Sequence, residues 1–481
     1  MYKKKLLFIV LLFSLFGISC KEPSKEDFLV QEDIKYFQNV LENGYVFYDD
    51  LIQKHHIKFD NEKIFKEYKK NLTKLRKDYQ YNIENGINQE ILLLPLWNFL
   101  VELEPNDGHL RIETNDTFWN ISNHKNLYIS DFYFTKKDDV FILTKCSNEK
   151  LIGKIYTGSN ENLRKTIINK SEMYMFAPIF DSSRVTTAAL NLNNKKYKVP
   201  VKLYAPKFSN KDLIKLMETD KTLYIRLSSF HIIQNTEQDK QFLKVLDEIP
   251  QKMLNKSYLI LDLRHNSGGY TFYPKELVTA IYNKRKNDNT RKEIWDFLNE
   301  SDKYTVYLKS SVVAEGNYRM SKKNNQTNDV LNSIQQEIEE QKKNEKKYYV
   351  GLENIPPSEL PQNSGEKIAS KIIVLIDFRT ASGAEKLIGY LYMMNKDNIL
   401  LVGLNSAGLL ASGSSIKYQL PNSKIEISLP SQSFVRTPIY NYIDTFHGET
   451  KGFEPDYWTN ENNLVETLIY LTGDSKIENL F

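Results

Sequence analysis

The sequence is poor in cysteine and in net charge. It has two cysteines among 481 residues, Cys20 and Cys146. If Cys20 is modified during processing, Cys146 has no partner, which excludes a structural disulfide and a cysteine-based zinc site. The 65 basic and 61 acidic residues leave a formal charge of +4, which gives no argument for a nucleic-acid partner. We assign the chain no metal ion and no cofactor.

Long apolar runs are also scarce, and one near the start of the chain is a processing signal. Residues 6–18 follow three lysines and are too few to span a bilayer comfortably. Residues 17–20, GISC, resemble a bacterial lipobox, although Gly17 stands where leucine is usual. The resemblance implies a signal peptide over residues 1–19, a lipidated Cys20 and a tether over residues 20–30. An ordinary secretory signal cleaved nearby is the alternative.

The charged residues after Cys20 resemble signals that send some lipoproteins to the cell surface. The expected location is therefore the cell envelope, with the chain anchored through Cys20 to the outer membrane on its periplasmic or cell-surface face.

The remaining sequence has the composition of a globular protein with several domains, since 41% of its residues are apolar and 12% are aromatic. Helical spacing of apolar residues predicts an N-terminal helical bundle over residues 31–110. Short alternating runs predict a β-rich module over residues 111–210. Alternating strands and helices predict an α/β core over residues 211–481. A highly charged insertion at residues 284–366 interrupts that core, and we expect a solvated helix or the edge of a lid there.

The core is organised around residues 372–385, IIVLIDFRTASGAE, in which a strand leads directly into a helix. Ser382 stands at the start of that helix and Gly383 permits close approach of the backbone. Unpaired amides at a helix start can stabilise an oxyanion. Ser382 is therefore the candidate nucleophile. The alternative is that Ser382 only caps the helix.

A second strand end favours the nucleophile. Residues 262–269 read DLRHNSGG and residues 380–385 read TASGAE. Together they resemble the motifs of serine peptidase family 41, which contains the C-terminal-processing (tail-specific) peptidases and the tricorn protease core. The resemblance covers about residues 224–458 well, and extends more weakly back to about residue 33.

The resemblance implies a crotonase-like α/β core, a degenerate PDZ-like module in the β-rich segment, and a peptide or protein substrate. It implies Ser382 as the nucleophile, with the backbone amides of Gly268, Gly269 and Gly383 as the oxyanion hole. The glycine-rich loop with which PDZ domains hold a peptide carboxylate is not evident in the module.

The general base distinguishes two branches of the family. The tail-specific branch pairs its serine with a lysine, but Leu409 stands at the matching position, and leucine cannot accept a proton. Three lysines lie nearby in the sequence without occupying that position: Lys386, Lys417 and Lys424.

The tricorn branch instead uses serine, histidine and glutamate. His109 matches its histidine, in residues 107–110, DGHL, and Glu449 matches the glutamate that precedes a Gly-hydrophobic-acid-Pro-acid motif. The resemblance therefore implies His109 as general base and Glu449 as the group that steers it, with His447 as a reserve base. Gly108 stands where tricorn has a serine, so a relay from Glu449 needs water or another hydroxyl.

Two functions follow. The first is a serine endopeptidase of the cell envelope that forms an acyl-enzyme on Ser382. The alternative is an inactive relative that acts as a surface lipoprotein and binds a peptide or an envelope polymer, because the lysine is missing and the PDZ-like segment is degenerate.

Overall fold

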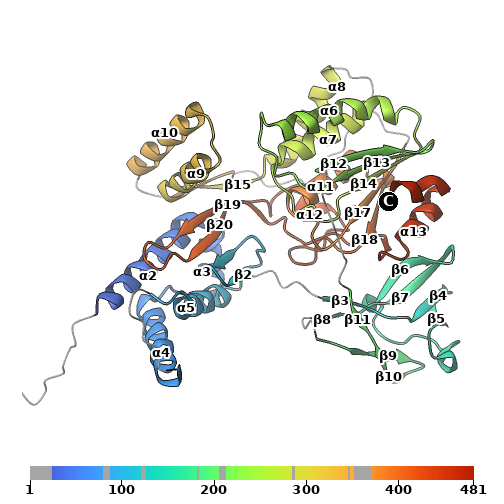
Figure 1. Cartoon of the computed structure of the whole chain (residues 1–481), viewed down its shortest axis with the longest axis horizontal. Coiled ribbons are helices and arrows are strands. Elements are labelled where there is room, and N and C mark those ends of the chain that lie inside the picture. The colour runs from blue at the N-terminus through green and yellow to red at the C-terminus, as the bar shows by residue number, and fades with distance from the viewer. Residues whose placement is uncertain are drawn as a thin grey trace, which may run out of the picture.

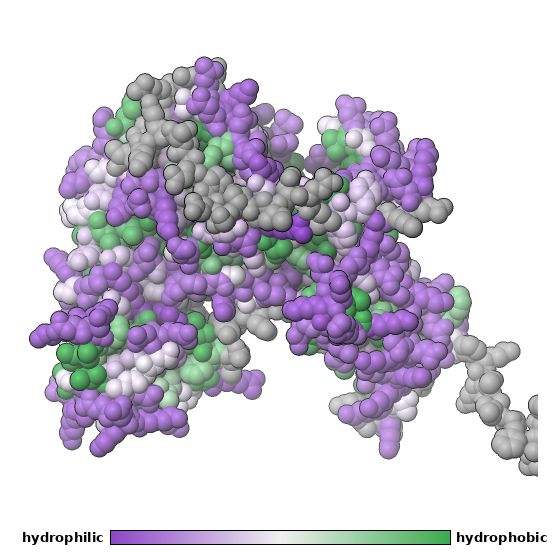
Figure 2. Space-filling model, turned by 180° about the vertical axis from the view of Figure 1, so that it is seen from behind, coloured by the Kyte–Doolittle hydropathy of each residue, from purple (hydrophilic) through white to green (hydrophobic). Residues whose placement is uncertain are grey.

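The computed structural model describes residues 24–79, 87–120, 126–180, 184–204, 213–283, 288–344, 347–351 and 370–481. They form a mixed α/β fold with an N-terminal helical part, a β-rich part and an α/β core (Figure 1). Figure 2 shows the opposite face, where hydrophilic residues cover most of the surface and a gap separates the β-rich part from the helical part. The predicted signal peptide and Cys20 lie outside the described residues. In the described ranges, no helix is long and apolar enough to cross a membrane.

The α/β core is built on a six-stranded sheet of order β12-β13-β14-β17-β18-β21. Every strand pair is parallel except β12 with β13. The strands are β12 (Ile214–Glu218), β13 (Thr222–Leu227), β14 (Tyr258–Asp262), β17 (Lys371–Ile376), β18 (Ile399–Gly403) and β21 (Tyr457–Trp458).

Helices cover both faces of this sheet, which explains why its central strands are continuously apolar. One face packs on α6 (Glu237–Met253), α7 (Phe272–Tyr282), α11 (Gly383–Asn395) and α12 (Pro438–Tyr442). The other face packs on α13 (Leu464–Thr472) and the short helix η4 (Ser475–Leu480). Another short helix, η3 (Lys396–Asn398), joins α11 to β18.

The sheet places two polar loops side by side. Strands β14 and β17 are parallel neighbours, and Asp262 at the end of β14 pairs with Leu375 of β17. The loops that follow them, residues 263–269 and 377–382, therefore leave the same edge of the sheet. Loops at the carboxyl ends of parallel strands are the usual place for a site in an open α/β sheet.

The N-terminal helices share one apolar core with strands from distant parts of the chain. The helices are α2 (Lys25–Gly44), α3 (Tyr48–His55), α4 (Asn61–Tyr79) and α5 (Gln89–Glu102). The strands form a second six-stranded sheet: β1 (Arg111–Glu113), β2 (Phe118–Asn120), β15 (Val306–Lys309), β16 (Tyr348–Val350), β19 (Ser412–Gln419) and β20 (Glu426–Ser433). Strands β1 and β2 thus belong with the helices, although the sequence places residues 111–120 in the β-rich module.

The described residues of the charged insertion include the helices α8 (Asp288–Asp302), α9 (Ser311–Lys323) and α10 (Asn328–Asn344). Helix α9 packs tightly on β19, because a Cβ atom on Gly316 would lie 2.2 Å from Cγ2 of Ile416. The insertion therefore contributes to the N-terminal core through α9 and β15.

Where the structure describes it, between residues 126 and 204, the β-rich part forms three small antiparallel sheets. Its elements are β3 (Asn126–Ile129), β4 (Tyr133–Lys137), β5 (Val140–Lys145), η1 (Glu149–Leu151), η2 (Asn160–Asn162), β6 (Leu163–Ile168), β7 (Ser171–Phe176), β8 (Ile179–Phe180), β9 (Thr187–Leu192), β10 (Lys195–Pro200) and β11 (Lys202–Leu203). Strand β6 contacts β21 and α13, which attaches this part to the core. Cys146 follows β5 and is a half-buried free thiol.

The buried carboxylate of Asp33 joins α2 to the β19–β20 turn, since it accepts hydrogen bonds from Asn422 N at 2.8 Å and Ser423 N at 2.7 Å. We expect Asp33→Ala to lower the free energy of unfolding by about 2–3 kcal/mol, because it leaves both amides without their acceptor. Urea unfolding measures the change. The exposed neighbour Lys35 supplies the control, and Lys35→Ala should stay within about 0.5 kcal/mol of the wild type. Equal losses in the two variants would contradict this role.

Candidate active site

The glycine loop after β14 lies directly against Ser382. A Cβ atom added to Gly268 would lie 2.9 Å from Ser382 Cβ and 2.6 Å from Gly383 N. A Cβ atom added to Gly383 would lie 2.8 Å from Gly269 O. The structure therefore brings the predicted nucleophile and the three predicted oxyanion-hole residues together, at contacts that only glycine allows.

Ser382 is held in a strained conformation at the first turn of α11. Its backbone has φ 51° and ψ −115°, and the residue is half-buried rather than enclosed. A non-glycine residue with positive φ costs free energy and persists where its surroundings fix it, often at functional sites. A serine on a sharp strand-to-helix turn presents its hydroxyl at the edge of the sheet, as nucleophiles of this kind do.

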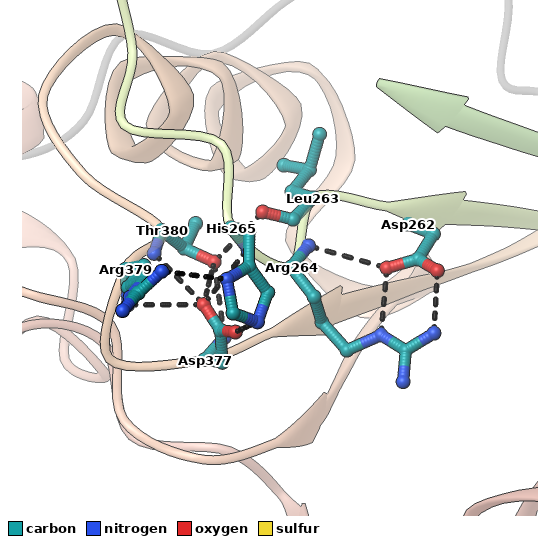
Figure 3. Close-up of polar contacts among 7 residues, drawn as sticks. All are labelled: Asp262, Leu263, Arg264, His265, Asp377, Arg379 and Thr380. Carbon is teal, nitrogen blue, oxygen red and sulfur yellow. Dashed lines mark hydrogen bonds and ion pairs between the residues drawn. The ribbon is translucent and has the colours of Figure 1, made fainter. Parts of the chain in front are cut away.

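Asp377 joins the two loops (Figure 3). Its Oδ1 accepts hydrogen bonds at 3.0 Å from the backbone amides of His265, Arg379 and Thr380, and its Oδ2 lies 2.9 Å from His265 Nε2. Thr380 Oγ1 in turn donates to the carbonyl of Leu263 at 2.9 Å. The turn that carries Ser382 is thus tied to the start of the glycine loop.

Beside this link, Arg264 makes a two-pronged ion pair with the buried Asp262, at 2.8 Å from Nε and 2.6 Å from Nη2 (Figure 3). The guanidinium lowers the pKa of Asp262 against the opposing effect of burial. The pair fixes the end of β14, from which the glycine loop departs.

Glu385 binds Ser382 and the loop that follows β18. It is fully buried, and it accepts hydrogen bonds from Ser382 N at 2.9 Å and from Gly408 N and Leu409 N at 2.7 Å. Ser406 Oγ donates to it at 2.5 Å. Burial raises the pKa of Glu385, and these donors oppose the rise.

Leu409, at the position of the lysine in the tail-specific branch, packs with Ala381 and Ala407 beside Ser382. An apolar side chain therefore packs against Ala381, the residue before the predicted nucleophile.

Glu449 binds backbone amides rather than the His109 ring. Its carboxylate accepts from Leu410 N at 2.7 Å, from Ala411 N, and from Gly108 N at 3.4 Å. Burial, followed by the nearby charge of Asp107, raises the pKa of Glu449 well above its ordinary value. Among the described residues, Glu449 is linked to the loop of His109 by its hydrogen bond with the amide of Gly108, the residue before the histidine.

His109 lies in the loop between α5 and β1, with 12% of its side chain exposed. Its Nδ1 is 3.1 Å from Ser412 Oγ and 3.9 Å from Asp107 Oδ1. Burial, assisted by the charge of Arg111, lowers the pKa of His109 to about 4. The ring is therefore neutral at neutral pH, as a general base must be.

Residues 408–412, which we call the strap, connect Ser382 to His109. Gly408 and Leu409 bind Glu385, on the helix of Ser382, while Ser412 contacts His109. No hydrogen bond joins the Ser382 hydroxyl to the His109 ring, although both residues are described. Hydrogen bonds between catalytic groups are often long before substrate binds.

The four other basic residues that were considered from the sequence each have a partner. His447 Nε2 lies 3.0 Å from Glu454, and Lys386 Nζ lies 2.7 Å from Asp302. Lys417 pairs with Glu113 and Glu426, and Lys424 donates to the carbonyl of Pro421.

Four residues of the site were given no role from the sequence: Asp107, Asp377, Glu385 and Ser412. The spacing S-x-x-E from Ser382 to Glu385 is a capping-box pattern, and Asp377 ends an apolar strand, so both carried a local signal. Asp107 is two residues before His109. Nothing local connects Ser412 to residue 109, because only the fold brings them together.

The fold and the site define a hydrolase with a serine nucleophile on an α/β core. Residues 221–459 match the sequence model of Peptidase family S41. The chain belongs to this family through that segment, and it is a serine peptidase. No curated protein matches the sequence significantly.

Solved structures of low sequence identity align over most of the chain. Mature CPAF in complex with lactacystin is 13% identical over 95% of this chain and 98% of that chain, with a TM-score of 0.40. The photosystem II D1 C-terminal processing protease is 12% identical over 95% and 100%, with a TM-score of 0.35. A Bacteroides fragilis protein assigned to the same family is 13% identical over 92% and 94%, with a TM-score of 0.35.

The close approach of Gly268 to Ser382 gives a test. Gly268 has φ +89°, and Gly153 has a similar φ of +84° with nothing within 4 Å of an added Cβ. Either alanine variant should lose about 1–2 kcal/mol of stability from its backbone conformation. Only Gly268→Ala should also abolish peptide hydrolysis, because its methyl group displaces Ser382. Activity assays and thermal unfolding separate the effects, and an active Gly268→Ala enzyme would show that the loop does not border the reaction.

Proposed function

We propose that the chain is an endopeptidase of the cell envelope that cleaves peptide bonds through an acyl-enzyme on Ser382, with His109 as general base. The observation that carries the proposal is the strained, accessible Ser382 held against Gly268 at the start of α11. Its substrate is a peptide or a protein.

In the first step, His109 Nε2 takes the proton of the Ser382 hydroxyl while Oγ attacks the peptide carbonyl. The backbone amides of Gly268, Gly269 and Gly383 are the donors for the oxyanion. The imidazolium then gives its proton to the leaving amine, and the acyl-enzyme forms. His109 then takes a proton from water while the water oxygen attacks the acyl carbon; the bond to Ser382 Oγ breaks, Oγ receives that proton back from His109, and the acid product leaves. The mechanism requires Ser382 and His109 to approach each other when substrate binds.

The structure supports the histidine branch of the family over the lysine branch. Leu409 has no proton acceptor, and the amine of Lys386 is bound to Asp302. His109 is neutral and attached through the strap to the nucleophile's own helix. The proposal therefore follows the tricorn type of site.

The finer description of the fold belongs to the same proposal. Parallel strands with helices on both faces support a crotonase-like core. The small antiparallel sheets between residues 126 and 204 support a degenerate PDZ-like module.

The proposed location is the outer membrane, through a lipid on Cys20. Helix α2 begins at Lys25, five residues after that cysteine. Five extended residues span at most about 17 Å, so a lipid on Cys20 would hold the helical part close to the bilayer.

The nucleophile is tested by Ser382→Ala. We expect this variant to lose both peptide hydrolysis and labelling by a serine-directed fluorophosphonate, because the attacking oxygen is gone. Ser171, exposed on β7, supplies the control, and Ser171→Ala should label like the wild type. Undiminished labelling of the Ser382 variant would refute the assignment. A wild-type protein that binds peptide but neither hydrolyses it nor labels would favour the inactive binding protein.

The base is tested by the dependence of activity on pH. Because burial lowers the pKa of His109 to about 4, its neutral form persists as pH falls to that value. We expect the acid limb of kcat/KM near pH 4 rather than near the value of about 6.5 of an ordinary histidine. The rates are measured on a peptide without ionisable side chains, with circular dichroism to confirm folding at each pH.

The matched control for this profile is His447→Gln. It removes the alternative base, whose side chain is 44% exposed, and it should leave the acid limb of kcat/KM in place. Loss of activity in a folded His447→Gln variant would identify His447 as the base instead.

A further inference from the structure

We propose that Ser412 and Asp107 are the positioning residues of His109, in the role that the family resemblance gives to Glu449. Ser412 Oγ is 2.7 Å from Asp107 Oδ1 and 3.1 Å from His109 Nδ1. Ser412 and Asp107 are each about 1% exposed, so water does not compete for the contact between them. This inference rests on the proposed function, because it describes how the proposed base is held.

The donors around Asp107 determine the direction of the chain of hydrogen bonds. The backbone amide of His109 donates to Oδ1 at 3.0 Å, and Tyr45 OH donates to Oδ2 at 3.1 Å. An amide N–H can only donate, and a phenol donates to a carboxylate. Asp107 is therefore an acceptor at both oxygens, and the Ser412 hydroxyl gives its proton to Asp107.

A hydroxyl has one proton, so Ser412 faces His109 with a lone pair. It accepts the hydrogen bond from Nδ1–H of the ring. The neutral ring then has its remaining lone pair on Nε2, which is the form that can take a proton from Ser382.

The same arrangement offsets part of the effect of burial, which disfavours the charged ring that forms during the reaction. Asp107 Oδ1 lies 3.9 Å from Nδ1, on the far side from the proton-accepting nitrogen. A carboxylate at this distance in a buried site favours the imidazolium. Ser412 transmits this effect as an inserted hydroxyl between the acid and the base.

Glu449 is occupied elsewhere. Its oxygens accept from the amides of Leu410, Ala411 and Gly108, so it fixes the strap and the backbone before His109. Gly108 offers no hydroxyl that would relay Glu449 to the ring. The hydroxyl that does reach the ring comes from β19, and its acid is Asp107.

The test compares Ser412→Ala, Ser412→Thr and Ser415→Ala in the full chain. Ser415 lies on the same strand, and among the described residues its hydroxyl has no hydrogen-bond partner. We expect Ser412→Ala to lower kcat by about tenfold to a hundredfold and to leave KM within about twofold of the wild type. This loss is smaller than the loss of about 10²–10⁴-fold that removal of a general base causes. Ser412→Thr keeps the hydroxyl and should recover most of kcat. Ser415→Ala should match the wild type.

The outcomes separate the two proposals. If Ser412→Ala has the kcat of Ser415→Ala, or if a folded Ser412→Thr does not recover activity, then Ser412 does not position the base. Should Ser412→Ala fail to fold, Asp107→Asn serves instead, and a folded Asp107→Asn with wild-type kcat would overturn the inference. Hydrolysis that persists in Ser382→Ala would instead refute the proposed function.

Discussion

The site depends on three buried carboxylates that hold one short stretch of backbone. Glu385, Glu449 and Asp107 bind successive groups of the strap, from Gly408 N to Ser412 Oγ. Burying a carboxylate is costly unless hydrogen-bond donors surround it, and the strap supplies donors to all three. Burial also raises the pKa of each of these three acids. The strap therefore cannot shift without leaving a buried acid unsatisfied, and this couples the serine at one end to the histidine at the other.

The strap has this position because the chain leaves the α/β core and enters the N-terminal core. Strand β18 belongs to the core sheet, whereas β19 and β20 complete the core of the N-terminal helices. Asp33 of α2 binds the turn between β19 and β20, and β20 pairs with β1, which follows His109. The histidine and the strand that contacts it are thus fixed in one body. The serine is fixed in another, and the strap joins the two.

Much of this site was predictable from the sequence, because its motifs are local. Two apolar runs stop at polar turns, and this pattern predicts the strand ends at Asp262 and Asp377. The glycine pair and Ser382 lie in those turns, and the parallel pairing of the two strands brings them together. The sequence also indicated that a relay from Glu449 to His109 needs water or another hydroxyl. It did not identify Ser412, because residues 109 and 412 meet only through the pairing of β1, β19 and β20. For the same reason, the membership of β1 and β2 in the N-terminal sheet was not evident from their own residues.

The strap also bears on why we propose a base from the N-terminal part. The side chain of Leu409 packs against Ala381 while its amide binds Glu385, so the strap contributes no proton acceptor next to Ser382. A lysine at this position would combine nucleophile and base within the core, and the N-terminal part would then matter only for stability. Because residue 409 is leucine, the base that the strap contacts is the imidazole of His109, through Ser412. The peptidase activity that we propose therefore requires the docking of two bodies, and any change that separates β19 from the loop of His109 should remove the base while leaving the serine in place.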